Sequence, residues 1–578
     1  MARRGEKPIQ KKMVGWYDPG QLLHTAVQVV VSGLLGTRAD FRVLESLAVT
    51  QDTFDFGSEK EIWIDYVADL GDGWDSTYTI ASLLGAESLE VSLPSGMGGK
   101  FQTHRGRLLV MGGDEVYPVA SRQRYLERTV GPYEYALPET NSPHPNLFAI
   151  PGNHDWYDGL VSFSRLFCQE RWIGGWKTRQ KRSYFAIRLP HRWWIWGVDI
   201  QLESDIDQPQ LEYFRDVAEK MQEGDRVILV TAEPHWIYGN IYDPKFQSNL
   251  GFLEKNVIRA ARGTVQVSLA GDLHHYRRHE AGDGSQVQLI TSGGGGAFLH
   301  PAYGPPVSEI RMDTSPGVVY RLKSEFPNQN ISKQLLRRDL LFLLLNPKFG
   351  LLTGLLYALF GSQVGPFLRD SLLRIPFSAG NLFKAVGLSL KVALGTLPGI
   401  VWIVLVIGGF ISFTDTHKKL YRFIAGSLHG VSNLLALAFI GWLIVRLSRH
   451  GSFDLSQGPL PAQWAIVASL FVGGYITGSC LMGLYLYISL RFFRRHSNEA
   501  FSALHIPDYK NFLRLHIDQQ GGLTIYPIGV EKVPRRWEQP TSYSPGDPMR
   551  VPAGGVKIPA GLIEPAIRIR PRNRGSTV

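Results

Sequence analysis

The most constraining feature of this sequence is a pattern repeated in its first half, in which a short apolar run is followed by a polar side chain. Apolar runs of about four to eight residues bounded by glycine or proline predict buried β-strands. Ligands of open α/β sheets bind beyond the carboxyl ends of strands, so we expect the polar residues to gather at one edge. The runs are 62–68, 107–111, 147–150, 227–230 and 265–270, and the polar residues are Asp69, Asp114, Asn153, His235 and Asp272.

The third of these runs shows the pattern in its densest form. Pro151 and Gly152 end the strand, and Asn153, His154 and Asp155 follow directly. An amide, an imidazole and a carboxylate packed into one loop are costly unless they contact a metal ion or a phosphate group. A turn rich in Asn and Asp explains one such loop. Five in succession would each need separate buried partners, so we expect one shared ligand site.

Mixed oxygen and nitrogen ligands suit Mn, Fe or Zn. A carboxylate shared by two such ions gives a two-metal site, which stabilises both the attacking and the leaving oxygen of a displacement at phosphorus. A further run at 287–292 ends in four glycines, 293–296, which let the backbone approach closely. We expect this glycine run to pack near the site.

Over residues 60–300 the order of these blocks resembles the calcineurin-like metallophosphoesterase superfamily, whose blocks are D-x-H, G-D, G-N-H-(D/E), H and G-H-x-H. Residues 152–155 are the most specific match. Residues 69–71 read D-L-G, without the usual His, and residues 113–117 read G-D-E-V-Y. Both changes are similar to purple acid phosphatases, a branch of the superfamily in which the Tyr is a metal ligand.

The resemblance implies a two-sheet α/β sandwich and a hydrolase that cleaves phosphate mono- or diesters by attack of a metal-bound hydroxide. It also implies two divalent or trivalent metal ions that share Asp114. The first ion would be held by Asp69, Asp114, Tyr117 and His274, and the second by Asp114, Asn153, His235 and Asp272. His154 would protonate the leaving oxygen or stabilise the transition state, and Asp155 would orient His154.

The sequence departs from the blocks of the superfamily at the missing His and in the fifth block. Asp72 competes with Tyr117 for the place of the missing His. Asp272 replaces the first His of the fifth block, which alters the metal preference more than it abolishes binding. Arg277 and Arg278 lie where they could meet a substrate phosphate, but we expect them to form a solvated basic surface.

The fourth block is ambiguous in its register. Aligning on Pro234 puts Ala232 or Glu233 at the ligand position, whereas a shifted register puts His235 there. We favour His235 because an imidazole matches the role in the superfamily, and Glu233 remains the rival.

From residue 338 the apolar runs become long enough for membrane helices, which need about 20 mostly apolar residues. We expect three or four spans: 392–413, 423–447, 463–493 and a doubtful one at 340–361, which residues 346–348 (N-P-K) interrupt. Gly473, Gly474, Gly478 and Ser479 suit close helix packing in the last span. Residues 381–394 look amphipathic and suit a membrane interface.

Charges near the spans predict the orientation. With four spans, nine Lys and Arg residues lie on the side of the chain ends and six on the other, which favours cytoplasmic ends and a cytoplasmic catalytic domain. We expect the C-terminal strands to return to the sandwich. The expected segments are 1–50 (basic and helical), 51–330 (metallophosphoesterase), 338–495 (transmembrane helices), 496–535 (strands) and 536–578 (a tail rich in Pro and Arg).

Composition limits the remaining classes. With 44% hydrophobic and 19% charged residues the chain is neither disordered nor fibrous. The net charge of +10 suits anionic lipid or an anionic substrate, and we expect no nucleic-acid partner. Cys168 and Cys480 do not suggest a disulfide framework, which fits a reducing compartment. Two rivals are a degenerate, non-catalytic regulatory or scaffold domain, and a sandwich that regulates a transporter or channel formed by the membrane part. We also expect phosphoester substrates near lipid, from the fusion alone.

Overall fold

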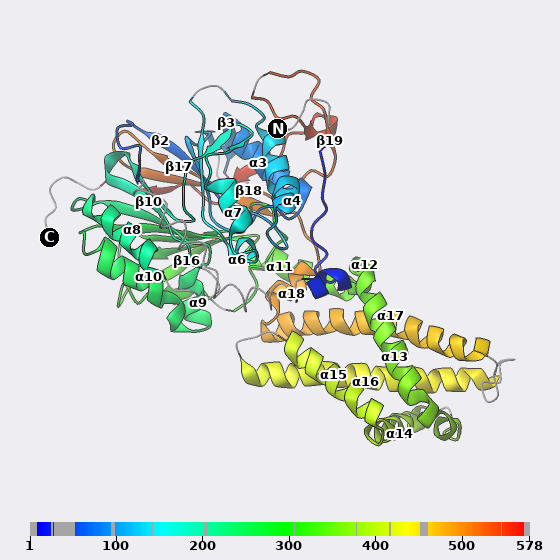
Figure 1. Cartoon of the computed structure of the whole chain (residues 1–578). Helices are drawn as coiled ribbons and strands as arrows, with labels where there is room; N and C mark the ends of the chain where they lie inside the picture. Colours follow the sequence, from blue (N-terminus) through cyan, green and yellow to red (C-terminus); the bar gives the residue numbers. More distant parts are fainter. Residues whose placement is uncertain are drawn as a thin grey trace. The chain divides into compact units, whose positions relative to one another are not determined.

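The computed structural model describes residues 8–24, 27, 53–93, 99–140, 143–200, 206–305, 307–376, 378–414, 418–450, 460–544 and 546–571. The chain divides into two compact units, whose elements are labelled in Figure 1. Unit 1 comprises Met1–Val14, Thr25–Ser332 and His505–Val578, and unit 2 comprises Gly15–His24 and Lys333–Leu504. Most of the segment expected at 1–50 lies outside the described residues.

The described part of unit 1 contains two nine-stranded sheets. The first sheet has the order β1 (Thr53–Asp55), β9 (Phe185–Leu189), β10 (Trp193–Gly197), β11 (Arg226–Val230), β12 (Thr264–Ala270), β14 (Gln288–Ser292), β13 (Tyr276–Ala281), β16 (Val319–Phe326) and β15 (Glu309–Arg311). Its strands β10, β11, β12 and β14 run parallel to one another. The carboxyl ends of these strands therefore share one edge.

The second sheet has the order β21 (Ala560–Leu562), β18 (Leu523–Val530), β17 (Lys510–Ile517), β2 (Ile62–Val67), β5 (Leu108–Met111), β6 (Asn146–Ala149), β8 (Trp176–Thr178) and β7 (Trp172–Ile173), with β22 (Ile567–Ile569) also paired to β18. Its strands β2, β5 and β6 are parallel. Two small pairs, β3 (Ser88–Ser92) with β4 (Lys100–His104) and β19 (Trp537–Glu538) with β20 (Val551–Pro552), stand apart from both sheets.

A hydrophobic core joins the two sheets, because Tyr66 and Val110 of the second sheet pack in one cluster with Ile228 and Val267 of the first. The residues next to them along the second sheet, such as Val67 and Leu109, point into a separate cluster. Strands buried on both faces read as continuous apolar runs, which is how they appear in this sequence. The two large mixed sheets agree with the expected α/β class.

Helices cover the outer faces. One cluster packs α3 (Trp74–Gly85), α5 (Gly131–Ala136) and α7 (Val161–Phe167) on the second sheet. Another packs α8 (Gln208–Glu219) and α10 (Ser248–Leu253) on the first. The other described α-helices before the apolar region are α4 (Arg122–Tyr125), α6 (Asn153–Trp156), α9 (His235–Ile241) and α11 (Gln329–Leu336), the last of which crosses from unit 1 into unit 2.

The C-terminal strands do return to unit 1. β17 pairs antiparallel with β2 from Leu513 opposite Tyr66 to Ile517 opposite Ile62. The region expected to be a tail also contributes structure, since β21 and β22 pair with β18. Pro- and Arg-rich composition did not reveal these short strands, because each gains its stability from β18 rather than from its own sequence.

Unit 2 is helical. Its elements are α12 (Phe342–Leu345), α13 (Pro347–Leu373), α14 (Leu382–Leu394), α15 (Leu397–Phe413), α16 (Lys419–His450), α17 (Leu460–Phe493) and α18 (Ser497–Ser502). Within the described residues, three stretches are long and apolar enough to cross a membrane: Pro347–Leu368, Lys419–Leu447 and Gln463–Phe493. A fourth is available if α14 and α15, bent by 105° at their junction, form one broken span.

The structure and the sequence expectation differ over which apolar run is interrupted. The stretch interrupted at residues 346–348 forms a continuous helix once Pro347 starts it, because proline fits the first turn of a helix. The run at 392–413 is instead broken, since Thr396 caps a new helix by accepting a hydrogen bond from the Gly399 N–H at 3.3 Å. A cap residue followed by Pro398 is a helix-start signal that hydropathy alone overlooks.

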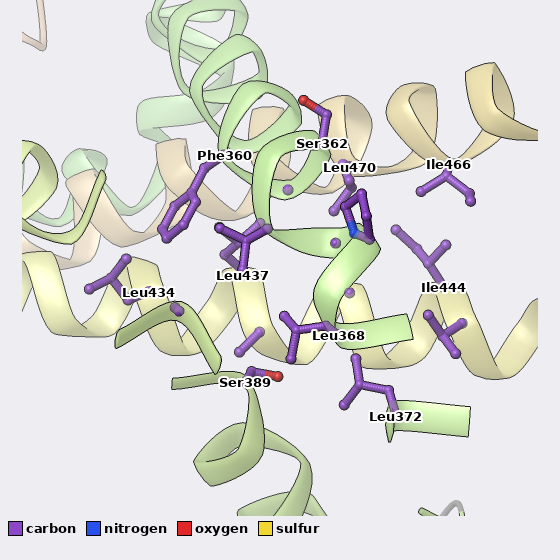
Figure 2. Close-up of a pocket in the computed structure, with 18 of the residues that line it drawn as sticks. Phe360, Ser362, Leu368, Leu372, Ser389, Leu434, Leu437, Ile444, Ile466 and Leu470 are labelled. Carbon is purple, nitrogen blue, oxygen red and sulfur yellow. The ribbon is translucent and has the colours of Figure 1, made fainter. Parts of the chain in front are cut away.

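Small residues of α17 allow close contact with α13. A Cβ at Gly474 would lie 2.4 Å from the Tyr357 Cβ, and one at Gly478 would lie 2.6 Å from the Thr353 Cβ. This agrees with the packing role expected for these glycines, because small side chains let helix backbones approach. Elsewhere in unit 2 the helices pack less closely, and α13, α14, α16 and α17 line a mainly apolar cavity of about 490 Å³ (Figure 2).

Candidate metal centre

Three carboxylates follow strands of the two sheets in a strained backbone conformation. Asp69 follows β2, Asp114 follows β5 and Asp272 follows β12, with φ angles of 57°, 55° and 65°. A non-glycine residue in the left-handed region costs about 1–3 kcal/mol, and such residues cluster at functional sites. Space around them is also restricted, because a Cβ at Gly152 would lie 2.1 Å from the Asp114 Oδ1.

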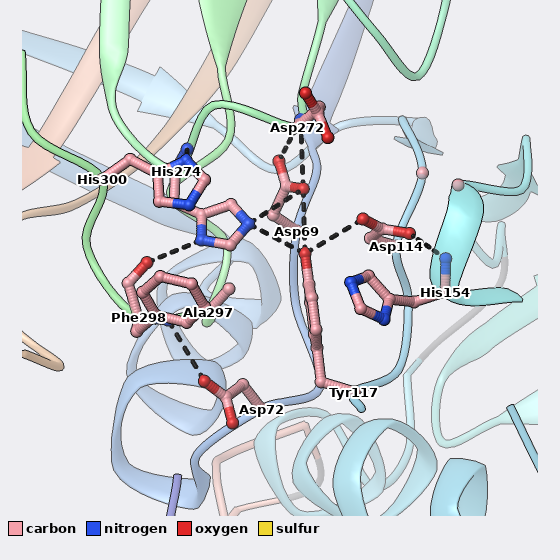
Figure 3. Close-up of polar contacts among 12 residues, drawn as sticks. Asp69, Asp72, Asp114, Tyr117, His154, Asp272, His274, Ala297, Phe298 and His300 are labelled. Carbon is pink, nitrogen blue, oxygen red and sulfur yellow. Dashed lines mark hydrogen bonds and ion pairs between the residues drawn. The ribbon is translucent and has the colours of Figure 1, made fainter. Parts of the chain in front are cut away.

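The Tyr117 hydroxyl contacts three other candidate ligands (Figure 3). It is 3.1 Å from the Asp69 Oδ1, 3.1 Å from the Asp114 Oδ2 and 2.9 Å from the His274 Nε2. All four side chains are buried. The structure thus brings together the residues expected at the first ion, which we call the Tyr117 cluster: Asp69, Asp114, Tyr117 and His274.

The ring of His274 has a fixed orientation. Its Nδ1 donates to the Phe298 carbonyl at 2.7 Å, so the neutral ring presents the Nε2 lone pair to Tyr117. His300 stacks on the ring with centroids 3.9 Å apart, and its Nδ1 accepts from the His274 N–H at 3.2 Å. Because burial lowers the pKa of His274 well below its usual range, this imidazole is neutral.

The cluster carries an excess of negative charge. Burial, followed by the charges of Asp114 and Asp272, raises the pKa of Asp69 well above its usual range. Burial, followed by Asp155 and Asp272, does the same to the pKa of Asp114. Carboxylates crowded in a buried site need a proton or a metal ion to offset their repulsion.

The donor set fits a metal ion. Two carboxylates, a phenol and an imidazole are ligands for Mn, Fe or Zn. Within the described ranges, however, no three His, Cys, Asp or Glu side chains are close enough to hold an ion by themselves, and Tyr117 is the residue in contact with Asp69, Asp114 and His274. Asp69, Asp114, Tyr117 and His274 would hold such an ion, which would offset the negative charge of the two carboxylates.

The second expected ligand set is incomplete. His235 begins α9, where burial lowers its pKa to about 3, and no described residue bonds its Nδ1. No hydrogen bond joins it to Asp114 or Asp272 among the residues described. Ala232, two residues beyond β11, lies beside Gly113, where an added Cβ would be 2.7 Å from the Ala232 Cβ. Glu233 lies close enough to raise the pKa of Tyr238 further.

His154 is held differently from the sequence expectation. Its Nδ1 donates to the Pro118 carbonyl at 2.6 Å, and its backbone N–H donates to the Asp114 Oδ1 at 2.9 Å. Burial lowers the pKa of His154 to about 4, so the ring is neutral with its lone pair on Nε2. The Asp155 carboxylate makes no hydrogen bond to the His154 ring.

Asp155 joins two loops instead. It accepts from the Gly152 N–H at 2.9 Å, from the Glu115 N–H at 3.2 Å and from the Tyr125 hydroxyl. The side chain therefore fixes the loop after β6 to the loop after β5. Neighbouring sequence positions suggested a His–Asp pair, but both residues lie in α6, and consecutive side chains of a helix point in different directions.

Asp72 lies apart from the Tyr117 hydroxyl (Figure 3). Its Oδ1 accepts from the Val14 N–H at 2.7 Å and its Oδ2 accepts from the Phe298 N–H at 3.2 Å. Burial raises the pKa of Asp72 to about 6. Of the two candidates for the missing His, Tyr117 is the one in contact with the other predicted ligands.

Arg277 and Arg278 do not form the solvated surface that we expected. Arg277 is paired with Glu325 at 3.0 Å and Arg278 with Glu564 at 2.6 Å, and both arginines are buried. Their acidic partners lie far away in the sequence, so the local basic pair gave no sign of burial. Neutralised in this way, neither arginine is a candidate for phosphate recognition.

Several residues near the cluster were not singled out from the sequence. Tyr238 donates to the Asp272 Oδ2, and Lys510 of β17 donates from Nζ to the Ala297 carbonyl at 2.6 Å. Burial lowers the pKa of Lys510 to about 7. No local motif marks either residue, because each reaches the site through tertiary structure alone.

Comparisons with known proteins add little. No family model and no curated protein matches the chain. One similar solved structure is GAP50, the anchor in the inner membrane complex of Plasmodium, at 13% identity over 46% of this chain and 82% of that one, with a TM-score of 0.30. Another is the purple acid phosphatase PPD1 of yellow lupin (Lupinus luteus), at 11% identity over 47% of this chain and 49% of that one, with a TM-score of 0.27.

The chain thus spans about half the length of the lupin phosphatase and is a weak structural neighbour of both proteins. With similarity this low, functional arguments rest on the residues of the site itself.

Proposed function

We propose that unit 1 hydrolyses phosphate mono- or diesters with the help of metal ions bound at the Tyr117 cluster. The convergence of Asp69, Asp114 and His274 on the Tyr117 hydroxyl carries this proposal, together with the strained backbone of Asp69, Asp114 and Asp272. Bound ions of this kind activate water and stabilise charge at phosphorus.

The protein groups around the cluster have definable roles in such a reaction. His154 is neutral and carries its lone pair on Nε2, so this nitrogen can accept a proton or a hydrogen bond from a bound substrate. Asp155, through Gly152 and Tyr125, holds the loop that carries His154. His300 stacks on His274 and fixes its ring.

Two buried carboxylates give a matched test. Asp114→Asn should lose bound metal and lower hydrolysis of p-nitrophenyl phosphate or bis(p-nitrophenyl) phosphate by at least about a hundredfold. Asp72→Asn removes a charge from a carboxylate that binds backbone N–H groups, and it should keep both metal and activity. Equal metal content and activity in the two variants would refute the proposed site.

A non-catalytic metal-binding or scaffold module is the second candidate. It is favoured by Ala232, which follows β11 at a position where one register placed a ligand of the second ion, and by the lack of a hydrogen bond between His235 and Asp114 or Asp272 among the described residues. Metal analysis of the full chain separates the two candidates. About one ion per chain without turnover of either substrate would support the module, whereas turnover would exclude it.

We further propose that unit 2 anchors the chain in a membrane with unit 1 in the cytoplasm. The three long apolar helices support insertion. Because β2 and β17 pair in one sheet, the chain must leave and re-enter on one side, which requires an even number of crossings. Counting α14 and α15 as one broken span gives four. A protease-protection assay on sealed vesicles tests this sidedness. Residues 53–330 and residues 505–571 should be accessible to the protease from the same side.

A further inference from the structure

Lys510 is a fully buried lysine whose amine contacts one acceptor among the described residues. Its Nζ donates to the Ala297 carbonyl at 2.6 Å, and it forms no ion pair in the described part of the chain. Burying such an amine without a carboxylate in contact is costly, because the charge loses its solvation. An apolar side chain could fill this space at a lower cost, which indicates that the hydrogen bond to Ala297 is what position 510 provides.

The carbonyl that Lys510 holds belongs to the segment that orients His274. Ala297 and Phe298 follow the glycine run and lie beside His274 (Figure 3). The Phe298 carbonyl accepts the hydrogen bond from the His274 Nδ1 at 2.7 Å, and this bond fixes the direction of the ring. Lys510 therefore holds the chain one residue before the group that orients an expected metal ligand.

The peptide group between Ala297 and Phe298 is held on both of its polar sides. Its N–H donates to the Asp72 Oδ2 at 3.2 Å, and its carbonyl accepts from Lys510. Asp72→Asn keeps an oxygen that can accept from this N–H. Lys510→Met, in contrast, removes the one donor that the described residues offer to the carbonyl.

The stretch of chain around Lys510 also supports the neighbouring residues of the glycine run. The Asn511 N–H donates to the Gly294 carbonyl at 3.1 Å, and the Leu299 N–H donates to the Ile506 carbonyl at 3.0 Å. A Cβ added at Gly294 would collide with the Asn511 backbone, so the two segments are in close contact. This support comes from a part of the chain 213 residues beyond Ala297.

We propose that Lys510 is a positioning residue of the metal centre, which holds the Ala297 carbonyl so that Phe298 orients His274 for metal binding. The proposal rests on the proposed function of unit 1, since it takes His274 to be a metal ligand. The centre then depends on the chain that follows the apolar helices as well as on the strand ends that precede them.

The test uses the full chain in mild detergent, freed of metal and titrated with Co²⁺, whose visible spectrum reports the groups that bind it. Lys510→Met should bind Co²⁺ about 10–100-fold more weakly than the parent, as is typical when the support of a metal ligand is lost. Lys510→Arg keeps a donor and should restore most of the affinity and the parental spectrum. Arg514→Met is the matched control, because it removes a buried cation of β17 that pairs with Asp65 instead. This control should be less stable but should keep the parental affinity.

Hydrogen exchange of residues 293–300 gives a second readout that needs no metal. Exchange should be faster in Lys510→Met than in the parent, and it should not change in Arg514→Met. If Lys510→Met does not fold, Lys510→Gln replaces it. The nitrogen of that side chain lies one atom closer to the backbone and falls short of the Ala297 carbonyl, so the same loss of affinity is expected.

Parental Co²⁺ affinity or unchanged exchange in the folded Lys510→Met or Lys510→Gln protein would overturn the role of Lys510. An equal loss of affinity in Arg514→Met would also overturn it, because the loss would then follow the stability of β17. A parent that binds no Co²⁺ would instead overturn the metal centre of the proposed function, and the role of Lys510 with it.

Discussion

Arg514 of β17 forms a buried ion pair with Asp65 of β2, 449 residues away along the chain, with the Arg514 Nε 2.6 Å from the Asp65 Oδ1. A second bond joins the Arg514 Nη2 to the Asp65 Oδ2 at 3.2 Å. Both side chains are fully or almost fully buried. This pair links the strand that precedes Asp69 to the segment that follows the apolar helices.

Removing one partner of this pair should destabilise unit 1. We expect Arg514→Met to lower the free energy of unfolding by about 3–5 kcal/mol, because it leaves the Asp65 carboxylate buried without its partner. Arg188→Met, which breaks an exposed pair with Asp55, should cost at most about 1 kcal/mol. Urea unfolding followed by tryptophan fluorescence measures both, and similar losses in the two variants would contradict this explanation.

Replacing the central phenol should weaken metal binding while keeping the fold. We expect Tyr117→Phe to bind metal at least about tenfold more weakly, since one donor of the cluster is lost. The matched control is Tyr133→Phe, because Tyr133 is buried and no described residue bonds its hydroxyl. Metal titration of both proteins decides the matter: retention of full affinity in Tyr117→Phe would exclude the phenol as a ligand.

A buried acid in unit 2 predicts a pH dependence of stability. Burial raises the pKa of Asp339 to about 8, and neither of its carboxylate oxygens has a hydrogen-bond partner among the described residues. The pKa of Asp339 is higher in the folded than in the unfolded chain, so protonation of Asp339 favours the folded state. This stabilisation is complete below about pH 4 and is lost as the pH rises towards 8. The expected slope is about 1.4 kcal/mol per pH unit.

Asp339→Asn tests this prediction, because it keeps the shape and removes the ionisation. Between pH 5 and pH 7 the stability of the parent should fall relative to that of the variant, as followed by unfolding in detergent. Glu309→Gln, at an exposed position of unit 1, serves as the control. Parallel stability curves for the parent and Asp339→Asn would show that Asp339 is already ionised.

The contact between α13 and α17 should tolerate no added side chain. Gly474→Val would place its Cβ 2.4 Å from the Tyr357 Cβ, so we expect a loss of about 1–3 kcal/mol through overpacking. Gly409→Val adds the same side chain to a position with open space and should change stability much less. Melting temperatures in detergent compare the two, and equal values would mean that α13 and α17 are not packed as described.

Patterns local in sequence predicted the parts of the site that depend on local structure. Asp69, Asp114 and Asp272 were found because a strand and a turn next to it suffice to place them, and their arrangement at the sheet edge followed from parallel pairing. Tyr117 could be proposed but not chosen over Asp72, since both lie within a few residues of a strand end. The structure favours Tyr117 because the backbone N–H groups of Val14 and Phe298 donate hydrogen bonds to the two carboxylate oxygens of Asp72.

Features that depend on distant partners could not be predicted. The burial of Arg278 requires Glu564, and the orientation of His154 requires the Pro118 carbonyl. The bend between α14 and α15 had a visible signal in Thr396 and Pro398, but the apolar run around them outweighed it. The strands after residue 536 are too short to stand out from their composition.

The pairing of β17 with β2 also has a consequence for synthesis. The ribosome synthesises β17 about 450 residues after β2. At typical elongation rates this takes about 20–90 seconds, during which β2 lacks this neighbouring strand. During this interval the edge of β2 is an unpaired strand, which is prone to aggregate unless it is covered. A nascent chain that stalls within the apolar helices therefore never completes the sheet that carries Asp69.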